Sequence, residues 1–345
     1  MRKLLFAITV AALSVAACSE PSSDLPRGKA SEALDQAFEK CTGAMIADGM
    51  ELHSMMVLQH GKVLEEKWFG EAAPDKPHVM WSVSKTFTSA AVGLAIDEGL
   101  LSLDTRLVDI FPDKLPEHVS DTLKRVTIEH LLTMSCGQDR EPRQPSSGDW
   151  ASYFLSYPLT HEPGEWFWYN SMGTYMLSAA IQEVTGQKVV DYLDARLFAP
   201  LGIAKPVWDE SPQGINLGGW GLNLRTEDMA KMGQLLLNGG RWRGKKVLPA
   251  SWVKEMSSAH IYSAPAGWSP EAVRDNKLTP ENSDWMQGYC YQMWRCRHNA
   301  FRADGAYGQY IIVLPDQDAV VAVTANIGDM QKEINYIWDY ILPAL

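Results

Sequence analysis

Ser82 and Lys85 are the two residues whose types and spacing could support nucleophilic chemistry. They lie at the start of a predicted helix in the stretch VMWSVSKTFTSAAVGLAIDEGLLSLD. Three residues apart on a helix, the two side chains share a face, so the lysine amine can reach the serine hydroxyl. Burial and the positive end of the helix dipole would both lower the pKa of Lys85. An unprotonated amine could then remove the proton from Ser82 and activate it as a nucleophile.

The bare S-x-x-K pattern is weak on its own. With 25 serines and 17 lysines in 345 residues, about one match is expected by chance, and the chain has two. The second, Ser251 and Lys254 in LPASWVKEM, is predicted to lie on a surface helix, where a serine near the start usually caps the helix. Capping is an equally good interpretation of Ser82 until further residues are considered.

Two pairs of strand-like runs lie at opposite ends of the chain. HSMMVLQHGKVLEEKWFG and GQYIIVLPDQDAVVAVTAN each consist of two apolar, β-branched runs around a turn. We expect them to share one antiparallel sheet, flanked by a helix at residues 31–47 and another from about Met330. Residues of roughly 100–280 show mostly helical patterning. The sequence therefore predicts an α/β (α+β) fold, with an antiparallel sheet flanked by helices and a largely helical inserted region.

The N-terminus is predicted to be a processing and anchoring segment. Arg2 and Lys3 precede the apolar run LLFAITVAALSVAA, which is short for a membrane span and typical of a signal peptide. The run ends in VAAC, which resembles the processing site of a bacterial lipoprotein with Cys18 as the lipidated residue; ordinary signal cleavage nearby is the alternative. We expect a signal peptide at residues 1–17 and lipid anchoring through Cys18 in the bacterial cell envelope.

The predicted domain organisation follows from these boundaries. Residues 18–30 form a polar tether, and one domain covers 31–345. Its α/β part is expected at about 31–100 and 285–345, and its helical part at about 101–284.

Charge and cysteine usage exclude some classes of partner. The net charge of −11 would become −13 without residues 1–17, because that segment carries two cations and no anion, so a nucleic-acid partner is not expected. Four cysteines remain in a compartment that permits disulfides, and their pairing stays open: Cys41, Cys136, Cys290 and Cys296. An extended chain would hold the last two about 20 Å apart, so we do not expect that pair to bridge. No metal-type spacing appears.

Five ordered segments carry a resemblance to a known family. They are WSVSKTFTSAAVGLAIDEGLLSLD, VTIEHLLTMSCG, PGEWFWYNSMGTYMLSAAIQEVTG, GGWGLNLRTEDMAKMGQLLLNGGRWRGKKVLPASWV and ADGAYGQYIIVLPDQDAVVAVTAN. Together they resemble the serine hydrolases related to class C β-lactamases, a family that also holds D-amino-acid peptidases, esterases and 6-aminohexanoate-dimer hydrolases. The resemblance runs from about residue 50 to the C-terminus, which makes it far more specific than any single motif.

The resemblance implies a role for each matching residue. Ser82 matches the acylated serine, Lys85 the adjacent base and Tyr169 the tyrosine of the Tyr-x-Asn motif. A phenol near an ammonium is stabilised as phenolate, so we expect Tyr169 and Lys85 to share one proton. The backbone N–H groups of Ser82 and Ala306 are expected to hold the oxyanion. No metal or organic cofactor is implied.

Two departures from the family pattern concern the substrate. Ser171 stands where the relatives carry an amide that binds the substrate. The third motif reads Ala303-Asp304-Gly305, so the cation that binds a carboxylate in β-lactamases is missing from its place, with Arg302 and His298 as possible substitutes. Ser171 and Gly305 are nevertheless predicted to contact the substrate. The pattern GAYGQ is similar to the esterase and 6-aminohexanoate-dimer hydrolase branch, which makes β-lactamase activity a weaker prediction.

The remaining motifs are predicted to be structural or to cover the site. His130 is expected to be a satisfied helix residue, because no G-x-S-x-G elbow surrounds a serine. The glycines of GGWGL, Gly218 to Leu222, are expected to allow close backbone approach beside the site. The segment from Ser263 to Trp285 is a long loop that could cover it.

The predicted function is therefore hydrolysis of a small-molecule carboxylic ester or amide through an acyl-enzyme on Ser82, with Lys85 and Tyr169 moving the proton. Two alternatives remain open at this point. One is a non-catalytic module that binds a ligand or the cell wall with the same fold. The other, within enzymes, is a β-lactamase or D-amino-acid peptidase.

Overall fold

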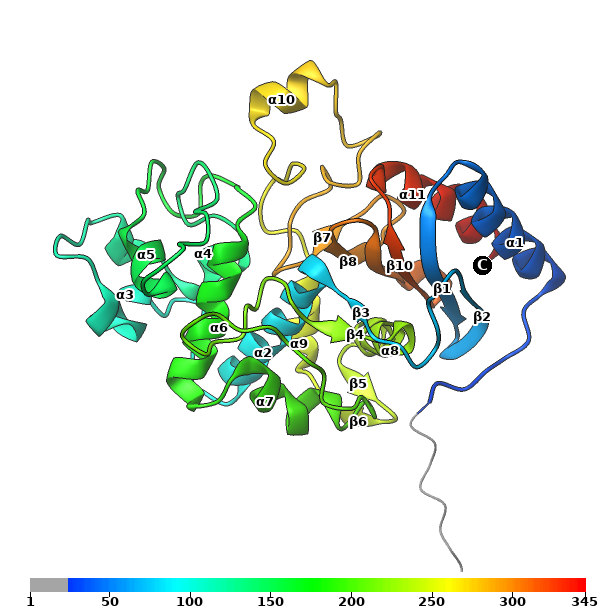
Figure 1. Ribbon diagram of the computed structural model, residues 1–345, viewed down its shortest axis with the longest axis horizontal. Helices are drawn as coiled ribbons and strands as arrows, with labels where there is room; N and C mark the ends of the chain where they lie inside the picture. The colour runs from blue at the N-terminus through cyan, green and yellow to red at the C-terminus, as the bar shows by residue number, and fades with distance from the viewer. Residues whose placement is uncertain (1–23) are drawn as a thin grey trace, which may run out of the picture.

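The centre of the molecule is a six-stranded antiparallel sheet built from both ends of the chain (Figure 1). The computed structural model describes residues 24–345. The strand order is β2-β1-β10-β9-β8-β7, and the strands are β1 (Glu51–Gln59), β2 (Lys62–Trp68), β7 (Trp294–Arg295), β8 (Phe301–Gly305), β9 (Gln309–Leu314) and β10 (Ala319–Asn326). β1 pairs with β10 along its whole length, which confirms that the two ends share one sheet.

Both faces of this sheet are buried, which explains the nearly continuous apolar runs in its central strands. On β9, Ile312 packs in the core that contains α1 (Glu32–Ala47) and α11 (Met330–Tyr336). Its neighbours Ile311 and Val313 point the other way, into the core that contains α8 (Thr226–Leu237) and α2 (Ser84–Asp97). The two predicted flanking helices, α1 and α11, are confirmed.

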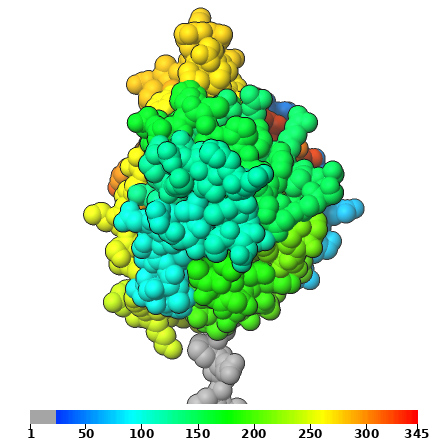
Figure 2. All heavy atoms as spheres, turned by 90° about the vertical axis from the view of Figure 1, so that its left-hand side faces the viewer, coloured from blue at the N-terminus to red at the C-terminus, as the bar shows by residue number. Residues whose placement is uncertain are grey.

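The inserted region is mostly helical, and its helices from α3 to α6 lie on the left side of Figure 1. Figure 2 shows the face that it presents. Its helices are α3 (Leu107–Ile110), α4 (Ile128–Leu132), α5 (Trp150–Ser156), α6 (Ser171–Thr185), α7 (Val189–Leu193), α9 (Ala250–Ser257) and α10 (Pro270–Asp275). Short strands connect them: β3 (His78–Val79) pairs with β4 (Asn223–Leu224), and β5 (Arg241–Trp242) with β6 (Lys245–Lys246). The predicted fold class is confirmed, with α8 of the inserted region covering one face of the sheet.

The N-terminal residues that the structure describes are docked on the domain. Leu25 is buried, and Arg27 pairs with Glu66 and Glu227. The predicted tether therefore lies against the domain from Leu25 onward, because it carries one apolar side chain and one paired cation. The predicted signal peptide and Cys18 lie outside the described residues. Within residues 24–345, no helix is both long and apolar enough to cross a membrane.

The four cysteines of the domain are all buried free thiols: Cys41, Cys136, Cys290 and Cys296. Cys290 and Cys296 do not bridge each other, but the expected extended segment between them is wrong: it is a tight turn in which Tyr289 and Trp294 form an antiparallel bridge. Burial raises the pKa of each thiol, to about 12 for Cys41 and Cys136 and to about 11 for Cys296. They are therefore protonated at neutral pH, which makes them poor nucleophiles.

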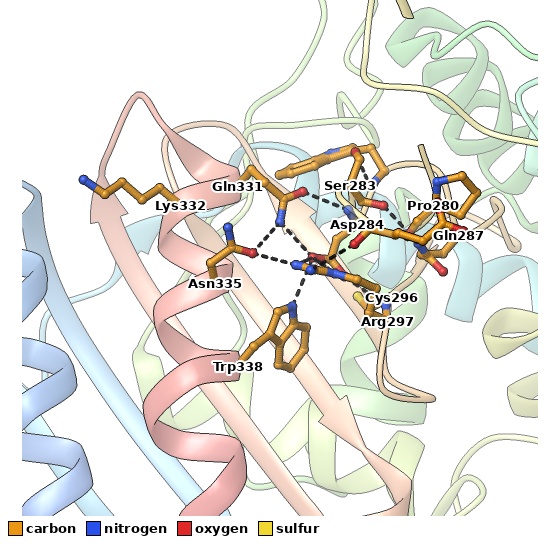
Figure 3. Close-up of polar contacts among 12 residues, drawn as sticks. Pro280, Ser283, Asp284, Gln287, Cys296, Arg297, Gln331, Lys332, Asn335 and Trp338 are labelled. Carbon is orange, nitrogen blue, oxygen red and sulfur yellow. Dashed lines mark hydrogen bonds and ion pairs between the residues drawn. The ribbon is translucent and has the colours of Figure 1, made fainter. Parts of the chain in front are cut away.

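Residues 263–285 form a flap that projects from the domain and carries α10 (Figures 1 and 2). The flap has a small apolar core of its own, formed by Ala264 and Val273 with Met286. Its end is fixed by Asp284, whose buried carboxylate accepts hydrogen bonds from Arg297, Gln331 and Trp338 (Figure 3). Burial opposes ionisation of this carboxyl, but Arg297 and Arg302 overcome it and lower the pKa to about 2. The flap is thus anchored by a charged group that stays ionised.

Glu333 of α11 is a second buried carboxyl, but it lacks such partners. Its side chain is fully buried, and neither oxygen has a hydrogen-bond partner within the described residues. It packs directly against Gly308, where a Cβ would lie 2.2 Å from Oε2. Burial first, and then the charge of Asp304, raise the pKa of Glu333 well above its ordinary value.

We predict that Glu333→Gln stabilises the protein at neutral pH. The unfolded chain releases the Glu333 proton near pH 4.5, whereas the folded chain retains it to a higher pH, so stability falls as pH rises between the two pKa values. Glutamine has nearly the same shape and cannot ionise. Thermal unfolding should show a Tm gain of roughly 1–2 °C at pH 7 for each kcal/mol by which the free energy of unfolding increases, and little gain near pH 4.

The matched control is Glu117→Gln, which changes an exposed carboxylate. Its Tm should stay close to that of the wild type at both pH values. An equal or lower Tm for Glu333→Gln at pH 7 would contradict a buried, protonated Glu333.

Candidate active site

Ser82 lies in a 3₁₀ turn, Trp81–Val83, that leads directly into α2. The turn is fixed from the inserted region, because the Met80 N–H donates to the Leu222 carbonyl at 2.8 Å. Lys85 is the second residue of α2, so the predicted position of both residues at the helix start is confirmed. Gly99 follows the helix with a left-handed φ of 74°, a backbone conformation that commonly ends helices.

Lys85 is buried within reach of three oxygens. Its Nζ lies 3.0 Å from Ser82 Oγ, 3.1 Å from Ser171 Oγ and 2.8 Å from the Gly219 carbonyl oxygen. The residue is only 1% exposed. Burial lowers the pKa of Lys85 to about 7, even though nearby Glu141 and Asp304 favour the charged form. Near neutral pH, a large fraction of the protein therefore carries a free amine at this position.

The arrangement of partners points that amine at Ser82. A carbonyl oxygen can only accept, so Gly219 takes one N–H of Lys85. Ser171 Oγ can accept a second N–H, which leaves the lone pair of a neutral amine for the Ser82 hydroxyl proton. The three contacts thus select the geometry of a base acting on a serine.

Tyr169 stands beside the same pair. Lys85 Nζ lies 4.8 Å from the centroid of its ring, and its side chain hydrogen-bonds to Ser82. Burial raises the pKa of Tyr169, and the carboxylates of Asp304 and Glu141 raise it further, so the expected stabilisation as phenolate is wrong. Tyr169 is a neutral phenol here. A phenol in this position can donate a proton.

The two predicted oxyanion donors come from elements that are pressed together. At Gly305 an added Cβ would lie 2.4 Å from the Met80 carbonyl oxygen, so only glycine lets the end of β8 approach the turn that carries Ser82. Trp81 and Tyr307, which adjoin Ser82 and Ala306, both have left-handed backbones with φ of 46° and 65°. Their rings meet edge to face at 5.5 Å. Such strained backbone is typical of positions where the structure fixes a functional geometry.

Ser82 opens onto two cavities. The larger of the two has a volume of about 630 Å³ and is lined by Glu141, Arg143, Ser171 and Trp220, among others. The other, of about 550 Å³, lies under the flap and is lined by Tyr169, Asp304 and Ala306 together with residues of the flap and the start of α11. We call it the flap cavity. The prediction that residues 263–285 cover a site is confirmed, with a short helix where a loop was expected.

The two candidate substitutes for the missing cation do not reach the flap cavity. Arg302 has no exposed surface and is held by Asp304 and by the Asp284 carbonyl. His298 lies in an exposed turn with its ring against Trp338. The proposed substitution is therefore wrong. Both faces of β8 are covered, which forces the Arg302 side chain into the core, and the cavity displays Asp304 in its place.

Three residues of the site were not predicted. Gly219 accepts from Lys85, Asp304 lines the flap cavity, and Glu141 accepts from the Ser171 N–H at 2.6 Å. Gly219 carried a signal, since glycines beside the site were expected to allow close approach, and a Cβ there would lie 2.9 Å from the Ser171 carbonyl oxygen. Asp304 stood in the third motif, which drew attention to its position but not to its role. Ser171 lines the larger cavity, of about 630 Å³, and also contacts Lys85. Its predicted contact with substrate, like that of Gly305, stays a prediction.

Other tempting residues have structural roles. His130 completes a capping box at α4, because the Thr127 N–H donates to its Nδ1 at 3.1 Å. Ser251 and Lys254 are exposed on α9, as predicted for a surface helix, but the predicted capping role of Ser251 is wrong, because Pro249 occupies the N-cap position. Neither group lines a cavity with Ser82.

Comparison with known proteins places these observations in a family. The β-lactamase family model matches residues 42–345. The 6-aminohexanoate-dimer hydrolase of Paenarthrobacter ureafaciens is 25% identical over 318 residues, covering 86% of this chain and 76% of that protein. The lovastatin esterase of Penicillium rubens is 25% identical over 189 residues, covering 46% of each chain.

Solved structures show the same fold at low sequence identity. A penicillin-binding protein homologue from Caulobacter crescentus is 15% identical, with a TM-score of 0.71, and the match covers 92% of this chain and 99% of that one. A family VIII carboxylesterase is also 15% identical, with a TM-score of 0.69 and the same coverage. The family match spans most of the chain and includes Ser82, Lys85 and Tyr169. The protein belongs to the β-lactamase family of hydrolases.

Proposed function

We propose that this protein hydrolyses a carboxylic ester or amide through an acyl-enzyme on Ser82. The observation that carries the proposal is the buried Lys85 amine, 3.0 Å from Ser82 Oγ and with a pKa lowered to about 7 by burial. A lysine that only snorkelled from a capped helix would keep its amine in water. The relatives named as a 6-aminohexanoate-dimer hydrolase and an esterase support both bond types.

In the proposed acylation step, the free amine of Lys85 takes the proton of Ser82 as Oγ attacks the substrate carbonyl. The N–H groups of Ser82 and Ala306 stabilise the oxyanion. Tyr169, a phenol hydrogen-bonded to Ser82, donates its proton to the departing alcohol or amine and is reprotonated by the Lys85 ammonium.

Deacylation uses the same groups in reverse roles. A water molecule enters from one of the two cavities beside Ser82 and loses its proton to the regenerated Lys85 amine. Its oxygen attacks the acyl carbon, the carbon–Oγ bond breaks, and Oγ takes the proton from the Lys85 ammonium, which restores the free amine. The products are the free carboxylic acid and the resting Ser82 hydroxyl.

The displayed charges make a β-lactam or a C-terminal D-amino acid a weaker candidate substrate. Both carry a carboxylate, and the flap cavity offers no arginine, lysine or histidine among its described lining residues. Arg302 is already neutralised by Asp304 behind the cavity wall. Esters and amides that place no carboxylate in the flap cavity fit that cavity better, whereas the larger cavity beside Ser82 carries both Arg143 and Glu141.

We predict that a fluorophosphonate probe labels Ser82, since its phosphorus reacts with an activated serine oxygen and loses fluoride. Intact-mass spectrometry should show one adduct on the wild type and on Ser251→Ala, and none on Ser82→Ala. Ser251→Ala is the matched control because Ser251 belongs to the second S-x-x-K sequence. The absence of an adduct on folded wild-type protein would contradict the proposal and favour a non-catalytic binding module.

The pH dependence tests the role of Lys85. Below pH 7 the amine is protonated and has no lone pair, so the labelling rate should fall about tenfold per pH unit. Above pH 7 it should reach a plateau. Stopped-time labelling from pH 5.5 to 9 measures the profile, and Lys85→Ala should lower the plateau by at least about 100-fold. A rate that does not change between pH 5.5 and 8 would contradict a lysine base.

We also propose that the mature protein is anchored in the bacterial cell envelope by a lipid on Cys18. The apolar run before VAAC supports this, and the docked segment from Leu25 onward starts only a few residues after Cys18. Metabolic labelling with an alkyne fatty acid should mark the wild type, whereas Cys18→Ser should lose the label and leave the membrane fraction. Unchanged membrane association of Cys18→Ser would contradict the anchor.

A further inference from the structure

We propose that the flap cavity selects substrates whose bound group carries a positive charge, an organic ammonium, and disfavours those that carry a carboxylate. The inference rests on the proposed function and deepens it, because the cavity opens beside Ser82. Asp304 and Asp329 are the residues that would recognise the charge of the substrate.

The charged side chains on the cavity wall are all acidic. Within residues 24–345 the lining includes Asp304 and Asp329, and it includes no lysine, arginine or histidine. Asp329 is exposed at the start of α11, where it accepts from the Lys332 N–H at 3.0 Å. A ligand cation in the cavity would therefore meet two carboxylates, and a ligand carboxylate would be repelled by them.

In the ion pair between Asp304 and Arg302, the carboxylate faces the flap cavity and the guanidinium faces the core. Arg302 has a side chain with no exposed surface, whereas the Asp304 side chain is 10% exposed and lies on the cavity wall. Both guanidinium contacts are to Oδ2, at 2.9 and 2.8 Å. The pair thus presents its negative end to the cavity and its positive end to the core. Arg302 leaves Oδ1 unused, and besides Arg302 the carboxylate has a hydrogen bond with Trp285.

One neutral polar side chain that could bind a carboxylate, Gln331, is already hydrogen-bonded to other residues. Gln331 lines the cavity, but its Oε1 accepts from the Asp284 N–H and its Nε2 donates to Asp284 and Asn335, as Figure 3 shows. Its amide therefore has no free donor to offer. A carboxylate ligand would lose its hydration and gain little in return.

The other walls suit an apolar cation. Four aromatic side chains line the cavity: Tyr169, Trp268, Trp285 and Trp294. Aromatic faces attract alkylammonium groups, which are weakly hydrated and can leave water at low cost. One of these rings already contacts a cation on its core side: the guanidinium carbon of Arg302 lies 4.5 Å from the Trp285 ring centroid. Carboxylates and aromatic walls together are typical of ammonium recognition.

The test compares esters that differ only in charge. In one series the acyl chain ends in trimethylammonium, in its neutral tert-butyl isostere or in a carboxylate; in the other, choline butyrate is compared with its tert-butyl isostere. In at least one series, kcat/KM should be about tenfold higher for the cation than for the isostere, and the carboxylate ester should be the poorest substrate. Equal or better hydrolysis of the isostere in both series would overturn the inference.

Two variants assign the effect to the named residues. Asp329→Asn keeps a side chain that can cap α11, and it should lower the ratio of cationic to neutral kcat/KM by about two- to fivefold. Asp304→Asn should lower it further. Asp316→Asn removes the same charge at the turn between β9 and β10, at the opposite end of β10 from Asp329, and should leave the ratio unchanged. An unchanged ratio in both cavity variants would contradict the assignment.

A binding measurement separates this inference from the proposed function. Calorimetry on Ser82→Ala should detect hexyltrimethylammonium and show no binding of heptanoate, and Asp329→Asn in that background should weaken the ammonium signal. Hydrolysis of the esters without a preference for the cation would contradict cation selection by the flap cavity and would leave the proposed hydrolase function intact. Ammonium binding by a protein that hydrolyses none of the esters would support ammonium recognition in the flap cavity and would contradict the proposed hydrolase function.

Discussion

The chemistry of this molecule depends on keeping one amine out of water. Lys85 is 1% exposed, and the loss of hydration lowers its pKa to about 7. The cost of burying the amine is offset by three oxygen partners from different parts of the chain: Ser82 at the start of α2, Ser171 at the start of α6, and the Gly219 carbonyl. The site therefore exists only when these segments are packed together.

The fold supplies that packing by joining its two ends. Strands from the N- and C-termini form one sheet, which brings β8 against the turn that carries Ser82, and the inserted helices bring Tyr169 and Ser171 to the other side. The two carboxylates Glu141 and Asp304 then act on both members of the proton-transfer pair. They partly oppose the loss of charge at Lys85, and they help keep Tyr169 a phenol. One set of charges thus separates the base from the acid.

Contacts that are local in the sequence could be predicted, and those between distant segments could not. Ser82 and Lys85 share a helix turn, so their contact followed from spacing, and alternating apolar runs predicted both hairpins of the sheet. The carboxylates near Tyr169 come from other segments, and without them the proximity of Lys85 alone suggested a phenolate. Likewise, the pattern of apolar and polar residues along β8 does not reveal that both faces of this strand are covered. Arg302 was therefore expected at the site instead of in the core.

The most direct test of this account is the pKa of the Lys85 amine in the folded protein. NMR of protein carrying labelled lysine side chains can follow the titration, with the Lys85 signal assigned as the one missing from Lys85→Arg. We expect a titration midpoint near pH 7, far below the ordinary lysine value of about 10.4. A Lys85 signal that titrates near that ordinary value would show a permanently charged side chain, and would contradict its role as the base.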